Sequence, residues 1–286
     1  MKVGIESAAY LSRYGIKEGL ARLKRHGYDT IDLQDFVNTE TELFRLDAKG
    51  FEKKLLDLRK DCEDAGVEIF QAHGPWRWPP MDATPEERAE RFEKMARSIE
   101  GTAIVGCRNF VIHPIMPFGD YQDPEPETFY KMNFEFMNRL CDVAEKFGVT
   151  VCLENMPMPR ISLATPKQIL DFVKDVNRDS FKVCLDTGHC AVCGVDPAEA
   201  VRLTGKDYLA VLHVHDNDGR GDLHWLPGFG VINWKEFGKA LLDIGYNGSF
   251  SLETRVPGNV PESARESMEI GLFNIASAIC GNVQSD

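Results

Sequence analysis

Residues 209–217 read LAVLHVHDN and pass from an apolar run to polar residues within a few positions. The polar part continues as DGRGDLHW, so that residues 211–225 hold three of the chain's seven histidines together with three aspartates. A short apolar run without strict alternation is typical of a parallel strand that is buried on both faces. The stretch therefore predicts a buried strand that leads into either a metal site or a polar surface loop.

Runs of the same kind recur along the whole chain. The seven others are KVGIE (2–6), TIDLQ (30–34), VEIFQAH (67–73), NFVIHP (109–114), VTVCLEN (149–155), FKVCLDTGH (181–189) and GSFSLETR (248–255). Between the runs lie segments whose apolar residues recur at the three- and four-residue spacing of amphipathic helices, at 51–66, 85–106, 129–148 and 233–245. Several segments end in a glycine just before the next strand, where a left-handed helix cap is expected: Gly27, Gly66, Gly106, Gly148 and Gly245.

Eight strands that alternate with helices, without a break in composition, predict an α/β fold. We expect a single (β/α)8 TIM barrel that forms one domain over residues 1–286. The alternative is an open, doubly wound sheet. No G-x-G-x-x-G pattern follows the first strand, which disfavours a dinucleotide-binding form of that sheet.

Charge and composition limit the kinds of molecule that the chain is expected to bind. The formal net charge is −12, and no cluster of Lys and Arg stands out, so we expect a small-molecule substrate and no nucleic acid. No apolar run approaches the about 18 residues of a membrane span, and the first residues lack the apolar core of a signal peptide. The eight cysteines, including the pair Cys190 and Cys193 in CAVC, are interpreted as reduced, structural thiols, and the expected compartment is the cytoplasm.

Histidines and carboxylates gather at the ends of the predicted strands. These residues are His73, His113, Glu154, Asp186, His189, His213, His215, His224 and Glu253. A single such histidine is more often a hydrogen-bonded structural residue. The carboxyl ends of barrel strands meet at one face, however, and so many converging carboxylates and imidazoles need a cation or a substrate to balance them. The set predicts a divalent metal site, and its mixed nitrogen and oxygen ligands suit Mn, Zn, Co or Fe better than Ca or Mg.

Four motifs occur in an order that resembles a known group. They are CLEN (152–155), CLDTGH (184–189), HVHDNDG (213–219) followed by DLHWLPGFG (222–230), and SLE (251–253). The chain resembles, over nearly its whole length, the xylose isomerase-like TIM barrels, which include sugar phosphate isomerases and epimerases and the apurinic endonuclease IV family. The resemblance implies a metal quartet of Glu154, Asp186, a strand-seven histidine and Glu253. The family's spacing favours His213 as that histidine, whereas strand geometry alone favours His215.

The nuclease branch of this group carries additional ligands for a three-metal cluster. The chain has a candidate for each of them: His73, His113, His189, Asp222 and His224. We therefore expect one to three divalent ions per chain.

The resemblance implies an isomerase or epimerase that acts on a sugar or sugar phosphate through a metal-stabilised cis-enediolate. Glu154 and Glu253 would remove and return the proton. Expected substrate-binding residues are His189, Arg255, Trp76 and Trp225, with Trp78 and Phe118 on the same loops. A salt bridge for Arg255 and simple loop packing for the aromatic residues are the alternatives.

Other functions remain open beside this one. The first is a trinuclear phosphodiesterase of the apurinic endonuclease type, which the negative net charge opposes. The others are another metal-dependent carbohydrate enzyme such as a lyase, and a non-catalytic metal- or sugar-binding barrel. We also expect homo-oligomers that associate through the outer helices.

Overall fold

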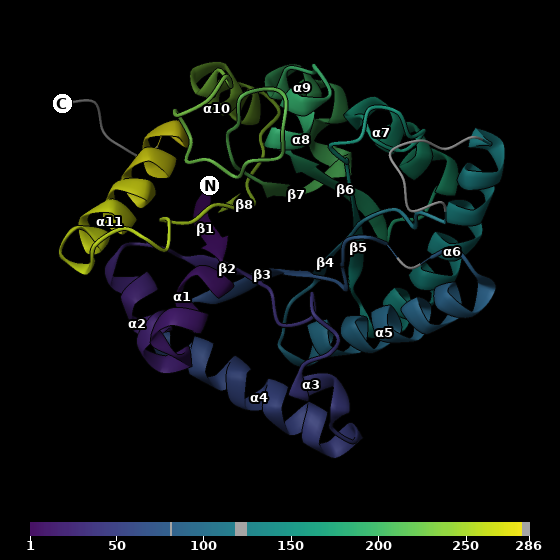
Figure 1. Cartoon of the computed structure of the whole chain (residues 1–286), viewed down its shortest axis with the longest axis horizontal. Coiled ribbons are helices and arrows are strands. Elements are labelled where there is room, and N and C mark those ends of the chain that lie inside the picture. Colours follow the sequence, from purple (N-terminus) through teal and green to yellow (C-terminus); the bar gives the residue numbers. More distant parts are fainter. Residues whose placement is uncertain (81, 118–124, 282–286) are drawn as a thin grey trace.

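The computed structural model describes residues 1–80, 82–117 and 125–281, and eight parallel strands lie at its centre (Figure 1). They follow one another in a single sheet in the order β7-β6-β5-β4-β3-β2-β1-β8. The strands are β1 (Lys2–Glu6), β2 (Thr30–Leu33), β3 (Glu68–His73), β4 (Asn109–Ile112), β5 (Thr150–Glu154), β6 (Phe181–Asp186), β7 (Leu209–His213) and β8 (Ser249–Leu252).

The two outer strands of this order meet just beyond the end of β7. Val214 forms a parallel bridge with Leu252. The Val214 N–H donates to the Ser251 carbonyl at 2.9 Å, and the Glu253 N–H donates to the Val214 carbonyl at 3.0 Å. These bonds bring the sheet round into a barrel, so the predicted (β/α)8 TIM barrel is confirmed and the open sheet is excluded.

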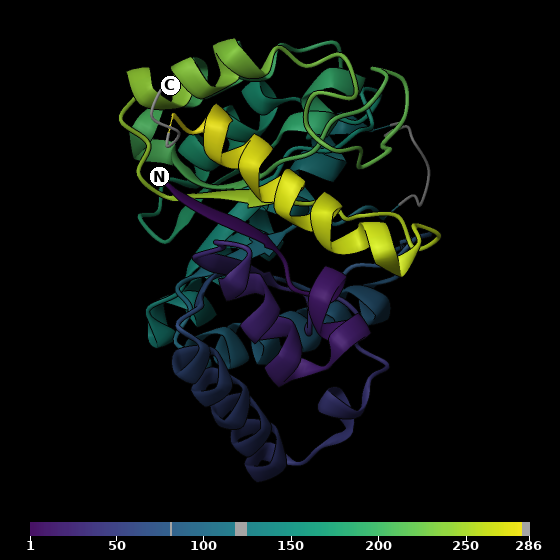
Figure 2. The same cartoon turned by 90° about the vertical axis from the view of Figure 1, so that its left-hand side faces the viewer.

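Helices surround the barrel on the outside (Figures 1 and 2). They are α1 (Ala8–Tyr14), α2 (Ile16–Arg25), α3 (Glu42–Arg45), α4 (Ala48–Ala65), α5 (Pro85–Ile104), α6 (Pro126–Phe147), α7 (Pro166–Val176), α8 (Thr187–Val192), α9 (Pro197–Tyr208), α10 (Trp234–Asp243) and α11 (Glu262–Ile279). The last helix, α11, packs against α10 and β1, so the last helix of the chain lies beside its first strand (Figure 2). In the part of the chain that the structure describes, no helix has the length and apolarity that crossing a membrane requires.

Glycines end several helices as expected. Gly66 adopts φ 69° and ψ 35° after α4, and its N–H reaches the carbonyls of Cys62 and Glu63. All five predicted glycines have positive φ, a conformation that other residues rarely adopt. The chain can therefore turn sharply from each of these helices into the next strand.

The strands are shorter at their carboxyl ends than the sequence suggested. β4 ends at Ile112, β7 at His213 and β8 at Leu252, so His113, His215 and Glu253 lie just beyond strands. A short helix that the sequence did not predict, α8, begins directly after β6. Asp186 caps it by accepting the His189 N–H, which holds His189 close to the strand ends.

The barrel interior has an apolar layer below its carboxyl end. Val111, Cys152, Cys184 and Val211 are fully buried and pack together there. Each lies two residues before a residue of the predicted site, namely His113, Glu154, Asp186 and His213. Because strand side chains repeat every second residue, the site residues form the next layer of the same interior.

All eight cysteines are free, as predicted. The Asn155 amide donates a hydrogen bond to the Cys190 sulfur at 3.6 Å, and the Cys193 thiol donates to the Met156 carbonyl at 3.3 Å. Both therefore serve packing between the β5 and β6 ends, consistent with the structural interpretation of this pair.

Candidate metal centre

Glu154, at the end of β5, lies at the centre of the polar layer and is almost fully buried. Its Oε2 is 2.9 Å from His113 Nε2, and its Oε1 is 3.0 Å from His213 Nδ1. His73 Nε2 lies 3.7 Å away from the same carboxylate. Burial disfavours the charged form, but the neighbouring imidazoles of His213 and His113 hold the pKa of Glu154 well below its usual range. Glu154 is therefore an ionised carboxylate surrounded by histidines.

Asp186, at the end of β6, organises a second part of the layer. Its Oδ2 lies 3.1 Å from His215 Nε2, while its Oδ1 accepts the His189 backbone N–H at 2.6 Å. The His189 ring donates through Nδ1 to the Asn155 carbonyl at 2.7 Å, which leaves Nε2 facing Asp222 at 3.4 Å. Burial opposes charge on His189, yet the carboxylates of Asp186 and Asp222 raise its pKa to about 10.

The loop after β7 folds back over these strand ends. The His224 ring stacks on the His215 ring at a centroid distance of 4.1 Å. His224 Nδ1 donates to the Glu253 carbonyl at 2.7 Å, and His224 Nε2 lies 3.3 Å from Asp222 Oδ2. The D-x-H pair of the sequence is thus joined to the strand ends, while both of its side chains stay partly exposed.

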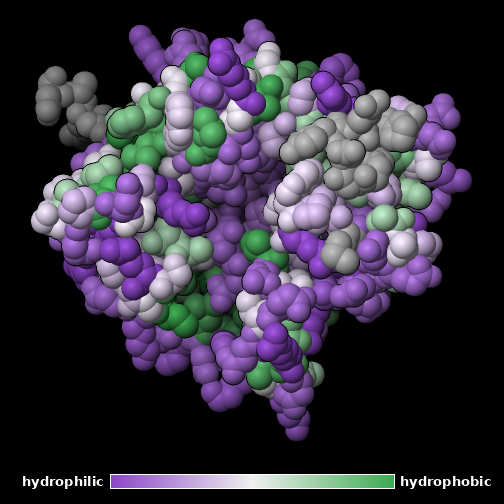
Figure 3. All heavy atoms as spheres, viewed as in Figure 1, coloured by the Kyte–Doolittle hydropathy of each residue, from purple (hydrophilic) through white to green (hydrophobic). Residues whose placement is uncertain are grey.

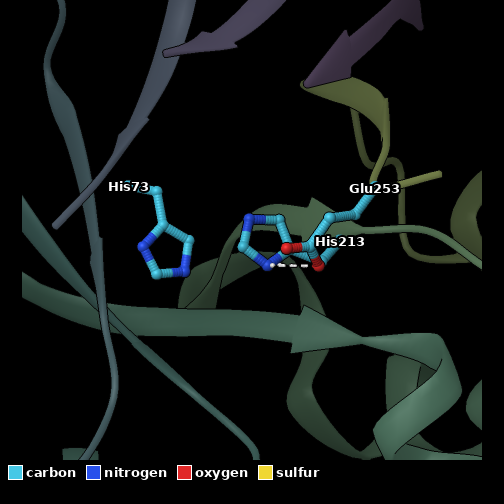
Figure 4. Close-up of side chains that lie close together, drawn as sticks. All are labelled: His73, His213 and Glu253. Atoms are coloured by element: carbon cyan, nitrogen blue, oxygen red, sulfur yellow. Dashed lines mark ion pairs between the residues drawn. The ribbon is translucent and has the colours of Figure 1, made fainter. Parts of the chain in front are cut away.

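Glu253 completes the layer from the end of β8, and Figure 4 shows its side chain pointing toward the His213 ring. Its Oε2 lies 3.2 Å from His213 Nδ1, yet this buried oxygen accepts no hydrogen bond. Burial and the nearby Glu154 charge raise the pKa of Glu253, against the effect of His213. A buried carboxylate oxygen without a hydrogen bond is costly in a protein interior, and a bound cation would satisfy it.

Asp32 is a site residue that sequence reasoning missed. Its Oδ2 lies 2.8 Å from His213 Nε2 and accepts a hydrogen bond from the Gln71 amide at 3.1 Å. The signal was present in the sequence, because an aspartate in the apolar run TIDLQ has to be paired if it points into the barrel. Asp32 and Glu154 together engage both ring nitrogens of His213.

The donor atoms of these residues fit a divalent metal. Several groups have one donor atom per residue within 4.8 Å of one another, among them His73, His213 and Glu253; His73, His113 and Glu154; Asp186, His189 and His215; and His215, His224 and Glu253. Imidazole nitrogens mixed with carboxylate oxygens are the ligands that Zn, Mn, Co and Fe accept. The structure therefore brings the predicted histidines and carboxylates into one layer that has the donors for a metal ion.

A cavity opens above this layer, and we call it the central cavity. Figure 3 shows a hollow with hydrophilic residues near the middle of this face of the molecule. The predicted substrate-binding residues His189 and Trp76 line the cavity, as does Trp78. It also has lining residues that the sequence did not single out: Gln34, Met156, Met158 and Arg220.

The two other predicted substrate-binding residues lie elsewhere. Arg255 and Trp225 line a second cavity, which shares His224 and Glu253 with the central cavity. Arg255 is 69% exposed and lies 3.7 Å from Glu6 at the end of β1, so the salt bridge considered from the sequence is present. Phe118 lies outside the described residues.

Asp216 holds the loop that carries Asp222, His224 and Trp225. Its buried carboxylate accepts five N–H donors: the backbone groups of Asn217, Gly228, Gly230 and Ile232, and the Trp234 indole. We expect Asp216→Ala to lower the free energy of unfolding by about 3 kcal/mol or more, because several buried donors lose a charged acceptor. Urea unfolding measures this, with Asp218→Ala on the exposed part of the same loop as the control. Equal unfolding midpoints for the two variants would contradict the role of Asp216.

Residues 20–272 match the model of the xylose isomerase-like TIM barrel family. The chain belongs to this family. The resemblance found in the sequence motifs is thereby confirmed over most of the chain.

Three curated relatives align with this chain over most of its length and most of their own. The uncharacterized protein MJ1311 of Methanocaldococcus jannaschii is 30% identical, over 89% of this chain and 84% of its own. The D-psicose 3-epimerase of Agrobacterium fabrum is 25% identical, over 88% and 84%. The inosose isomerase of Bacillus velezensis is 24% identical, over 94% of each chain. The epimerase and the isomerase among these relatives confirm the predicted enzyme class, that of isomerases and epimerases.

Among solved structures, the IOLI protein with a bound zinc atom has the same fold. It superposes with a TM-score of 0.78 at 20% identity, over 100% of each chain.

Proposed function

We propose that this chain is a divalent-metal-dependent isomerase or epimerase of a sugar or sugar phosphate that moves a proton next to the substrate carbonyl. The observation that carries the proposal is a pair of carboxylates, one buried and one largely buried, that approach the same ring nitrogen of one imidazole. Glu154 Oε1 and Glu253 Oε2 lie 3.0 Å and 3.2 Å from His213 Nδ1. Their strands, β5 and β8, are separated by β6 and β7 around the barrel. The carboxylates therefore reach the layer from different sides.

We propose that Glu154, Asp186, Glu253 and a histidine of the β7 end hold the metal. The sequence motifs favoured His213, and the contacts support that choice. His213 Nδ1 lies 3.0 Å from Glu154 and 3.2 Å from Glu253, while Asp32 holds the other ring nitrogen, as carboxylates do for metal-binding histidines. His215, whose Nε2 is 3.1 Å from Asp186, is the alternative. The zinc atom of the IOLI structure supports a metal on this fold. When bound, the divalent ion would act as a Lewis acid that makes the proton next to the carbonyl more acidic and stabilises the charge of the cis-enediolate.

The proton itself would be moved by the two glutamates. One carboxylate removes it from one face of the substrate, and the other returns a proton to the opposite face. Asp32, which lies 2.8 Å from His213 Nε2, would orient the His213 ring toward the two carboxylates. His189 faces the central cavity and is oriented by the Asn155 carbonyl, so it can donate to a substrate oxygen. Trp76 packs edge-on against His113 with ring centroids 4.3 Å apart, and it gives this cavity an apolar wall.

Proton exchange with solvent tests this function directly. Metal-loaded protein incubated with a ketose in D2O should place one deuterium on the carbon next to the carbonyl, because a glutamate exchanges its proton before returning it. Mass spectrometry and NMR of the recovered sugar measure the incorporation. Transformation of the sugar without any deuterium would favour hydride transfer or another chemistry and would contradict the proposal.

A second candidate function is phosphodiester hydrolysis by a cluster of up to three metals. It is favoured by the additional donors, since His189 and His224 both lie within 3.4 Å of Asp222. Elemental analysis distinguishes the two: about one metal per chain is expected for an epimerase and three for the cluster. Metal-loaded protein should incise a duplex with an abasic site at modest salt if the second function is correct, and no incision would remove it.

A further inference from the structure

The second cavity lies beside the central cavity and is largely apolar. Six of its lining residues are Leu223, Trp225, Leu226, Phe229, Pro257 and Met268. Of its polar lining residues, Glu253 and His224 also line the central cavity. These two side chains therefore stand between the metal layer and the apolar lobe, so the lobe is the space next to the metal layer on that side.

The aromatic residues of this lobe are unusually accessible. Trp225 is 40% exposed and Phe229 is 68% exposed, although both lie on the loop that Asp216 ties down. Exposed apolar patches with polar groups at their border often mark binding grooves for ligands. Ligand sites are mostly lined by apolar and aromatic side chains, with few polar groups that fix orientation.

The charges at the border of the lobe do not suit a phosphate group. Among the described residues that line this cavity, Arg255 is the only Lys or Arg, and its guanidinium already faces the Glu6 carboxylate at 3.7 Å. Glu6 is 13% exposed and belongs to the same cavity wall. A phosphate needs unopposed cations or backbone N–H groups, whereas the flat apolar side of a ring fits against an indole.

We propose that the lobe formed by Trp225, Phe229, Leu226, Pro257 and Met268 is a second subsite, which takes a ring linked to the reacting keto sugar. The substrate class is then a keto sugar that carries a glycosidic substituent, rather than a free or phosphorylated monosaccharide. This inference rests on the proposed function, because the reacting end of the substrate has to lie at the metal layer.

A matched pair of probes tests the subsite: the phenyl and the methyl glycoside of the same keto sugar. We expect the wild-type protein to bind the phenyl glycoside at least tenfold more tightly, by calorimetry on protein with or without metal. The kcat/KM measured by deuterium exchange should follow the same order, with the phosphorylated ketose below both. Trp225→Ala and Phe229→Ala should each reduce the phenyl preference to less than threefold. Val231→Ala should leave it unchanged, because Val231 is an exposed apolar residue of the same loop that does not line this cavity.

The outcomes separate the subsite from the function. Equal affinity for the two glycosides, or a preference for the phosphorylated ketose, would overturn the subsite even if deuterium enters every sugar. Absence of deuterium in all sugars would instead refute the proposed function, while the binding experiment still decides on the subsite. Equal affinities combined with dimers that dissociate on Trp225→Ala would reassign the patch to a contact between copies of the chain.

Discussion

Glu253→Gln and Glu154→Gln are each expected to lower kcat by about a thousandfold or more, since one positioned general base contributes roughly 10²- to 10⁴-fold. The amide has the same shape as the carboxylate but cannot accept the substrate proton. Both side chains also face the proposed metal position, so weaker metal binding adds to the loss. The fold should persist, because the layer beneath is apolar and independent of these charges.

Turnover by deuterium exchange, thermal unfolding and metal content should be measured on the same samples. Glu63→Gln makes the same chemical change on the exposed face of α4 and serves as the control. The control should retain wild-type turnover. Wild-type rates in both glutamine variants would end the two-base mechanism.

His213→Ala is expected to weaken metal binding by about a hundredfold or more, because even the partners that only orient a ligand contribute 10- to 100-fold. His215→Ala should have the smaller effect on affinity, since in our proposal His215 contacts Asp186 without binding the ion. The contacts of His213 Nδ1 with both Glu154 and Glu253 support this difference.

Competition with a chromogenic chelator measures both affinities. His26→Ala provides a control. His26 is buried at the end of α2, where its Nδ1 lies 3.0 Å from the Tyr10 hydroxyl, and it does not belong to the metal layer. A larger loss in His215→Ala than in His213→Ala would make His215 the ligand, as strand geometry alone had favoured.

The position of the polar layer was predictable from the chain alone. Eight apolar runs predicted eight strands, and the rule that parallel strands end at one face placed Glu154, Asp186 and Glu253 together. The side-chain repeat of two predicted that each would point inward above an apolar residue. The five glycine caps were predictable for the same reason, since they depend only on local backbone conformation.

Other features depended on residues that are far apart in the sequence. Asp32 is a site residue only because β2 and β7 face each other across the barrel, which brings its carboxylate to His213. The sequence grouped Trp225 and Arg255 with Trp76, but the path of the loop after β7 places them in another cavity. That path follows from the five N–H groups around the Asp216 carboxylate, and no local pattern encodes them.

The sequence by itself determined the barrel, the face that carries the site and the chemical types of the donors. These properties follow from periodicity and from backbone preferences, which act over a few residues. Only the tertiary structure decided which nitrogen faces which carboxylate, how His213 differs from His215, and which aromatic residues share a cavity. These relations depend on the depth of each side chain in the closed barrel and on hydrogen bonds between distant segments, so they exist only once the chain is folded.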